Sequence, residues 1–353
     1  SGKSRLIMKK KITFLVSVLA LAVLPLIWPD PYLLSVVASV GIFVIAAISL
    51  NLLLGYTGQL SLGHVAFFGL GAYTTSLLSL GFDVTLWGMT EPLVVTPQPV
   101  WLSFVCGIAF AAVAGWLLGK LAFRVRGAYF VIVTISFAQV MRMVSLNWVD
   151  LTEGPMALNN IPALTMWVPG EGVIELTSKL STYWLVLVVA VLSYLLVAAM
   201  VNSRVGRAMI ALRENEILAR SVGIRVTHYL GIATIFAAGI AGAAGGLYAH
   251  TVRIIDPDVF MFMFTIMMVI MVIVGGKGTL AGPVVGGLLF GLLPEALRGV
   301  VAPEIQWMIY GVLMIAVLVF MPKGVVPSAG NLLRRLSSKP LSEKTAVARR
   351  KIA

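Results

Sequence analysis

Long apolar runs are the feature that most constrains this chain. A helix that crosses the hydrocarbon core of a bilayer needs about 20 predominantly apolar residues. Of the 353 residues, 59% are hydrophobic and only 11% are charged, whereas a soluble domain carries about 25% charged residues. The sequence predicts ten membrane-spanning helices, at residues 12–28, 33–54, 60–80, 100–121, 128–147, 182–201, 229–249, 259–275, 281–298 and 305–321.

The distribution of charge gives these spans an orientation. With the N-terminus in the cytoplasm and the spans alternating, 22 of the 26 Lys and Arg residues fall on the cytoplasmic side. Cytoplasmic loops of membrane proteins are enriched in these residues. If one span were missed, the Lys and Arg residues would no longer fall mainly on one side of the membrane. The predicted fold class is therefore an all-α polytopic membrane protein of about ten transmembrane helices. Both termini are predicted in the cytoplasm, and glycine-rich broken or re-entrant segments are expected.

The domain organisation follows from the spans. Residues 1–7 precede a natural-looking start at Met8 and are interpreted as an expression remnant or an upstream start. The predicted segments are a cytoplasmic N-terminus at 1–11, a transmembrane domain at 12–321 with external loops at 81–99 and 148–181 and a cytoplasmic loop at 202–228, and a partly disordered cytoplasmic tail at 322–353.

Side chains that carry catalysis or bind metals are sparse. Cys106 is the only cysteine, and the three histidines lie far apart, so the spacing of a zinc site or disulfide framework is missing. The spans hold no chain of ionisable residues of the kind that proton- or sodium-driven carriers use. We expect no catalytic residue, metal site or cofactor in this chain. The net charge of +12 is assigned to loops that face an anionic membrane surface, not to nucleic-acid binding.

Residues 55–73, GYTGQLSLGHVAFFGLGAY, place five glycines and several hydroxyl groups in an apolar part of the chain. Glycine permits backbone bends and close helix approach, and a broken helix at membrane depth needs protein or water beside its peptide groups. Two interpretations stay open: tight helix packing alone, or packing beside a translocation pathway. The second assigns to the pathway Gly55, Tyr56, Gly58, Gln59, Ser61, His64 and Tyr73.

A second stretch, GGKGTLAGP at 275–283, repeats part of this pattern. Shifted by 220 positions, three residues of the first stretch fall on identical residues of the second: Gly55 on Gly275, Gly58 on Gly278 and Leu60 on Leu280. Both stretches are predicted at cytoplasmic turns between spans. Three matches suggest a parallel duplication without establishing one.

The cytoplasmic loop at 202–228 is predicted to contain a short amphipathic helix at 207–222, capped at its C-terminus by Gly223. A helix of this kind between two spans is suited to docking in the groove of a soluble partner. A helix that only lies on the bilayer would explain the arginines of the loop but not the central Glu214 and Glu216.

Several segments resemble one family of transport proteins. They are NLLLGYTGQLSLGHVAFFGLGAY (51–73), FRVRGAYF (123–130), LTEGPMALNNIP (151–162), GRAMIALRENEILARSVGI (206–224), LYAHTVRIIDPDVF (247–260) and GGKGTLAGPVVGGLLFGLLPEALR (275–298). Spread over most of the chain, they resemble the inner-membrane permeases of branched-chain amino acid ABC importers, of the LivM type. The family often has glycine where Ala157 follows GPM.

The resemblance implies a non-enzymatic subunit in the bacterial inner membrane, with 12–321 as its permease domain. It implies a paralogous LivH-type permease, two cytoplasmic ATPases of the LivG and LivF type that bind ATP and Mg²⁺, and a periplasmic substrate-binding protein. Gly154 and Pro155 are added to the pathway. The implied ATPase-coupling residues are Arg207, Arg213, Glu214, Glu216, Ala219, Gly223 and Ile224.

The expected mechanism is alternating access, in which the ATPases drive the loop at 206–224 and the path between two permeases opens. A weakly polar path without buried charge suits a zwitterion with an apolar side chain. Urea, short amides and other small organic acids stay open as substrates. A stand-alone channel or a secondary carrier is the alternative class, although a channel would not need the docking helix.

Overall fold

The computed structural model describes residues 19–27, 30–84, 92–123, 127–168, 172–175, 178–297 and 301–330. The predicted N-terminus at 1–11 and the tail beyond 330 lie outside the described residues. The first predicted span, 12–28, is described only at 19–27, which is helical.

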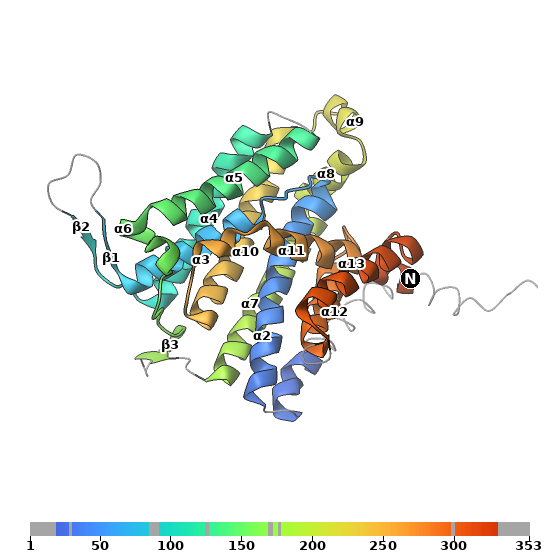
Figure 1. The fold of residues 1–353 in the computed structure, drawn as a ribbon. Helices are drawn as coiled ribbons and strands as arrows, with labels where there is room; N and C mark the ends of the chain where they lie inside the picture. Colours follow the sequence, from blue (N-terminus) through green and yellow to red (C-terminus); the bar gives the residue numbers. More distant parts are fainter. Residues whose placement is uncertain are drawn as a thin grey trace, which may run out of the picture.

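The other predicted spans coincide with helices (Figure 1). They are α2 (Pro31–Asn51), which continues as a π-helix (Leu52–Thr57), α3 (Val65–Leu80), α4 (Val100–Ala122), α5 (Ala128–Asn147), α7 (Lys179–Asn202), α10 (Val226–Val252), α11 (Phe262–Gly275), α12 (Gly282–Leu297) and α13 (Pro303–Phe320). Within the described residues, five helical segments are long and apolar enough to cross a membrane by themselves: Pro31–Thr57, Val100–Ala122, Ala128–Asn147, Lys179–Asn202 and Val226–Val252. The predicted all-α polytopic membrane fold is confirmed.

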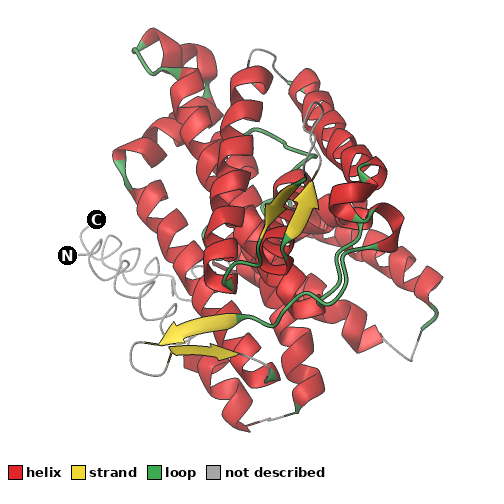
Figure 2. Ribbon diagram, turned by 90° about the vertical axis from the view of Figure 1, so that its left-hand side faces the viewer, coloured by secondary structure: helices red, strands yellow, loops and turns green. Residues whose placement is uncertain are grey.

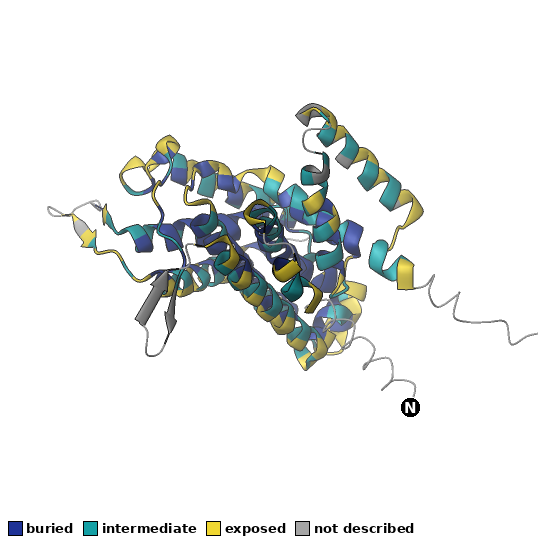
Figure 3. Ribbon diagram, turned by 90° about the horizontal axis from the view of Figure 1, so that it is seen from below, coloured by how far each residue is buried: buried dark blue, intermediate teal, exposed yellow. Residues whose placement is uncertain are grey.

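The helices pack around α2 and α10. Helix α2 contacts α7, α10, α11 and α12, while α10 lies against α3 and α4. In the most apolar window of each helix, 78% of α10 is buried but only 17% of α7, and Figure 3 shows the same contrast between inner and outer helices. Apolar side chains on α4, α5 and α7 therefore remain exposed, as expected for helices that face lipid.

Small residues allow the central helices to approach closely. Glycines of α3 and α10 meet where the helices cross, and a methyl group on Gly71 would lie 2.3 Å from the carbonyl oxygen of Gly242. Lipid supplies no hydrophobic drive between helices, so close backbone contact of this kind stabilises the bundle.

The connections divide between two ends of the molecule. One end carries α8 (Arg204–Glu214) and α9 (Glu216–Ser221) at the top of Figure 1, and the other carries the hairpins at the left and lower left. We call the first the basic end, after its residues Lys120, Arg204, Arg207, Arg213, Arg220, Arg225, Lys277 and Lys323. The other, the hairpin end, holds most of the described acidic residues, with Arg142, Lys179 and Arg253. Which end faces the cytoplasm stays a prediction.

The two loops predicted to be external contain short strands that the sequence did not predict (Figure 2). Strand β1 (Phe82–Val84) pairs antiparallel with β2 (Leu93–Val95), with Asp83 opposite Val94. Strand β3 (Thr165–Val168) pairs with β4 (Gly172–Glu175). These two-stranded hairpins satisfy the backbone of loops that lie beyond the helical bundle.

The segment after α5 is tied to the end of α10. It comprises α6 (Val149–Thr152) and a 3₁₀ turn (Gly154–Met156), followed by two backbone hydrogen bonds between Leu158 and Ile255, 2.8 and 3.0 Å long. Arg142 of α5 donates to Asp258 over 2.8 Å. Arg142 therefore joins α5 to the 3₁₀ turn Pro257–Phe260.

Ala157 has φ +61° and ψ 147°, a region that only glycine adopts without strain. We expect Ala157→Gly to raise the free energy of unfolding by about 1 kcal/mol, since the relieved strain exceeds the added backbone entropy. The check is the apparent Tm in detergent. The control is Ala163→Gly, in the same segment at a position without positive φ, which should lower the Tm. If both variants changed the Tm equally, the backbone of Ala157 would not be strained.

Candidate coupling site at the glycine-rich elbows

The loop at the basic end folds as two helices. Helix α8 begins at Ser203, whose hydroxyl accepts hydrogen bonds from the backbone of Val205 and Gly206. At Asn215 the backbone is extended, with φ −157° and ψ 105°, and its side chain accepts a hydrogen bond from Leu218 over 3.0 Å. The single helix predicted at 207–222 is therefore wrong. Asn215 ends α8 and caps α9, because a short polar side chain satisfies the free amides of a new helix.

The predicted glycine cap is confirmed. Gly223 has φ +88° and donates to the carbonyl of Arg220 over 3.0 Å, and Ile224 donates to the carbonyl of Ala219 over the same distance. This pair of bonds is the Schellman motif, which requires a left-handed residue at the glycine position.

The two helices bury different faces. In α8, Met209 and Leu212 are 0% and 6% exposed, so this helix is anchored in the protein. In α9, Ile217 and Leu218 are 81% and 62% exposed. An apolar face left open at the surface of a membrane domain is suited to contact with another subunit.

The first glycine-rich stretch forms an elbow at the same end, which we call the first elbow (residues 52–58). The π-helix after α2 ends at Gly58, with φ +76°. The carbonyl of Gly55 accepts a hydrogen bond from Nη1 of Arg213, over 2.7 Å. Arg213 is also paired with Glu214, with 2.6 Å between Nη2 and Oε1. The pairing orients the guanidinium of α8 toward the end of the first elbow.

The second glycine-rich stretch forms the second elbow (residues 276–281), between α11 and α12. Its Gly278 has φ +74°, close to the value of its counterpart Gly58 under the 220-residue shift. The two elbows touch: a methyl group on Gly55 would lie 2.4 Å from the backbone nitrogen of Gly278. The shared geometry supports the suggested duplication, and the contact itself was not predicted.

Asn51 joins the two elbows. Its Oδ1 accepts from the backbone N–H of Gly278, and its Nδ2 donates to the carbonyl of Thr279, each over 2.9 Å. Asn51 is 1% exposed, and both of its hydrogen bonds are part-buried. Sequence reasoning missed Asn51, although a lone amide inside an apolar span indicates a specific partner.

The coupling and pathway residues are therefore only partly brought together. All seven predicted coupling residues lie on α8, α9 or the C-terminal cap of α9: Arg207, Arg213, Glu214, Glu216, Ala219, Gly223 and Ile224. Arg213 is the one that is hydrogen-bonded to an elbow among the described residues. Glu216 pairs with Arg220 over 3.3 Å. Their role in coupling stays a prediction.

The predicted pathway residues are spread along the bundle. Gly55, Tyr56 and Gly58 lie at the first elbow, Gln59 follows it and is half-buried, and Ser61 is buried. His64 lies deeper, with Nε2 2.7 Å from the hydroxyl of Ser49, while its buried Nδ1 has no partner among the described residues. Tyr73 stacks on Phe260, and Gly154 and Pro155 lie at the hairpin end. These residues do not form one site, so a pathway along them stays a prediction.

Metal binding has no candidate site in the part of the chain that the structure describes. Groups of three or more His, Cys, Asp or Glu side chains close enough to hold an ion are not found there.

We expect Asn51→Ala to lower the free energy of unfolding by about 1–3 kcal/mol, because it removes the two part-buried hydrogen bonds to the N–H of Gly278 and the carbonyl of Thr279, each worth about 0.5–1.5 kcal/mol. Hydrogen exchange at the Gly278 amide should accelerate, and the apparent Tm should fall. Asn202→Ala is the control, since the exposed Asn202 amide bonds only to Ala198 of its own helix. Unchanged exchange at Gly278 would show that Asn51 does not hold the second elbow.

The apolar helical bundle defines a multi-pass membrane protein. The chain belongs to the family described as branched-chain amino acid transport system, permease component, whose sequence profile matches residues 32–318. The chain is accordingly a permease component of a transport system.

Individual relatives carry related names. The high-affinity branched-chain amino acid transport system permease protein LivM of Escherichia coli (strain K12) is 29% identical, over 90% of this chain and 75% of its own length. The LivH protein of the same organism is 27% identical, over 80% and 91%. A probable branched-chain amino acid transport permease protein LivM of Methanocaldococcus jannaschii is 25% identical, over 81% and 91%. No solved structure matches the chain.

Proposed function

We propose that this chain is the permease subunit of an ATP-driven, binding-protein-dependent importer of branched-chain amino acids in a bacterial inner membrane. The observation that carries the proposal is the family membership over residues 32–318, together with relatives named LivM and LivH. Two related permease types among the relatives support a heteromeric complex in which this chain pairs with a LivH-type partner.

Energy enters the complex from outside this chain. Two cytoplasmic ATPases bind ATP and Mg²⁺, and a periplasmic protein delivers the substrate to the hairpin end. The exposed Ile217 and Leu218 of α9 support an ATPase contact, because an apolar helical face that fits a groove is a common docking mode. This assignment places the basic end in the cytoplasm, in agreement with the positive-inside bias.

Arg213 carries movement of the docking helices into the membrane domain. When the ATPases close, they displace α9 and with it α8, whose guanidinium is bonded to the carbonyl of Gly55. A charged donor forms a stronger hydrogen bond than a neutral one, so the first elbow follows α8. Asn51 transmits the displacement to Gly278 of the second elbow. Helices α2, α11 and α12 then move together, and the path between the two permeases changes its access.

Reconstitution tests the proposal. The chain is co-expressed with its genomic neighbours for a second permease, two ATPases and a binding protein, and the complex is placed in proteoliposomes. We expect ATP-dependent uptake of leucine that requires the binding protein and is not reduced by excess urea or acetamide. Uptake without ATP would favour a channel or carrier, and uptake of urea or acetamide in place of leucine would overturn the substrate assignment.

The coupling role of Arg213 predicts uncoupling. We expect Arg213→Gln to assemble with the ATPases and hydrolyse ATP while leucine uptake falls at least about tenfold, because the charged bond to Gly55 is worth about 1.5–3 kcal/mol. Arg204→Gln, which removes an exposed charge from the start of α8, is the control and should transport normally. Equal loss of ATP hydrolysis and uptake in Arg213→Gln would instead indicate a defect in assembly.

A further inference from the structure

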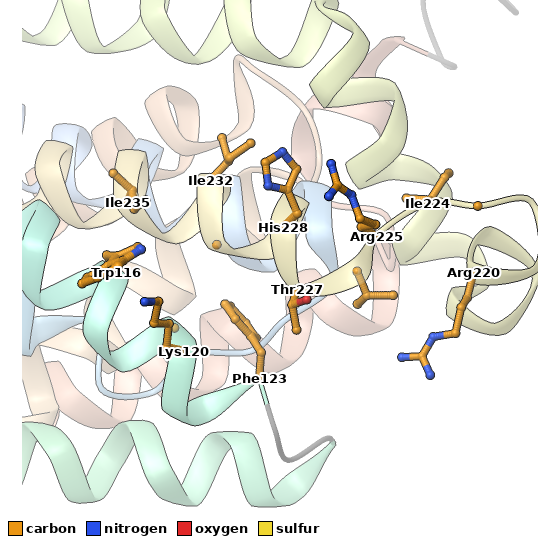
Figure 4. Close-up of a pocket in the computed structure, with 14 residues that line it drawn as sticks. Trp116, Lys120, Phe123, Arg220, Ile224, Arg225, Thr227, His228, Ile232 and Ile235 are labelled. Carbon is orange, nitrogen blue, oxygen red and sulfur yellow. The ribbon is translucent and has the colours of Figure 1, made fainter.

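A groove lies at the basic end beside the docking helices. It has a volume of about 950 Å³ and is formed by the last turns of α4, the end of α9 and the first turns of α10. Figure 4 shows Trp116, Lys120 and Phe123 on α4 beside the start of α10. The predicted coupling function uses only the rim of this groove, at Gly223 and Ile224.

The mouth of the groove is positively charged. Lys120, Arg220, Arg225 and His228 line it, and none of its lining residues is acidic. The ammonium of Lys120 lies 3.7 Å from the ring centre of Trp116. Arg220 is paired with Glu216 on the same helix. Among the described residues, no acidic side chain pairs with Lys120 or Arg225, so their charges are available to a ligand with a phosphate group.

The wall of the groove becomes apolar with depth. Trp116 on α4 and Ile232 and Ile235 on α10 continue it beyond the charged mouth. Ten residues separate Arg225 from Ile235, which is about 15 Å along a helix. This is about half of the 30 Å hydrocarbon core of a bilayer, the depth of one leaflet.

The wall is also open. A methyl group on Gly231 would meet no atom within 4 Å, so the α10 side of the groove presents a flat backbone surface. An extended hydrocarbon chain fits such a surface without displacing a side chain.

We propose that this groove binds an anionic phospholipid of the leaflet at the basic end. The phosphate binds at the charged mouth that Lys120 and Arg225 line, and an acyl chain extends along Trp116, Ile232 and Ile235. Basic pockets between helices on the cytoplasmic side of membranes bind anionic headgroups, and the charge and depth of this groove match a whole lipid. Because the lipid contacts the link between α9 and α10, it steadies the docking helices against α4.

A docked ATPase is the competing occupant, and the structure disfavours it. The exposed apolar residues of α9, Ile217 and Leu218, do not line the groove. The groove instead runs along α4 and α10 at the depth of the acyl chains, which a soluble protein does not reach. A free phosphate would use the mouth and leave the apolar wall unused.

The test measures lipid binding without transport. The full chain, with the subunits that co-purify, is placed in phosphatidylcholine nanodiscs with increasing phosphatidylglycerol, and the apparent Tm is recorded. We expect phosphatidylglycerol to raise the Tm. Lys120→Gln and Arg225→Gln should each raise the half-maximal lipid fraction about fivefold, and the double variant about thirtyfold.

Controls separate the occupants. Arg204→Gln removes the same charge outside the groove and should leave the lipid response unchanged, and the double variant Lys120→Arg with Arg225→Lys should restore it. A response in Arg204→Gln equal to that of the groove variants would overturn the proposal in favour of general surface charge. The proposal would also be overturned if glycerol phosphate alone raised the Tm as much as phosphatidylglycerol does. It would be overturned, too, if the groove variants lost the ATPases while their Tm response to lipid stayed unchanged. These readouts do not depend on leucine uptake.

Discussion

The side-chain amide of Asn51 is the interaction on which the arrangement of the basic end depends. An amide offers a donor and an acceptor at once, and here they meet the adjacent N–H of Gly278 and carbonyl of Thr279. The bonds form because Gly55 and Gly278 bring two backbones together without side chains between them. The end of α2, the turn between α11 and α12, and Arg213 of α8 thus meet at the two elbows.

The spans could be predicted from the sequence because the bilayer fixes both their length and their composition. The run at 128–147 matches α5 to the residue, and the run at 100–121 differs from α4 by one. The C-terminal cap of α9 could also be predicted, since a glycine after an amphipathic stretch identified the cap at Gly223. In each case the signal lies within a few turns of the helix that it describes.

Other features depend on partners that the local pattern does not contain. Asn51 lies more than 200 residues from Gly278, so its role is visible only when the elbows meet. The break at Asn215 was missed because the residues on both sides favour a helix, and only the capping geometry reveals the change of direction. The pathway residues were grouped by composition, and the structure separates them because small residues serve packing along the whole bundle.

The division of the loop into α8 and α9 has an evolutionary consequence. The inner helix holds its position through Met209 and Leu212, whereas the outer one attaches through little more than Ala219. Substitutions at the outward-facing positions of α9 therefore leave the membrane core untouched. Lineages that duplicate such a permease are free to diverge at this short helix, while the elbows beneath it stay under constraint.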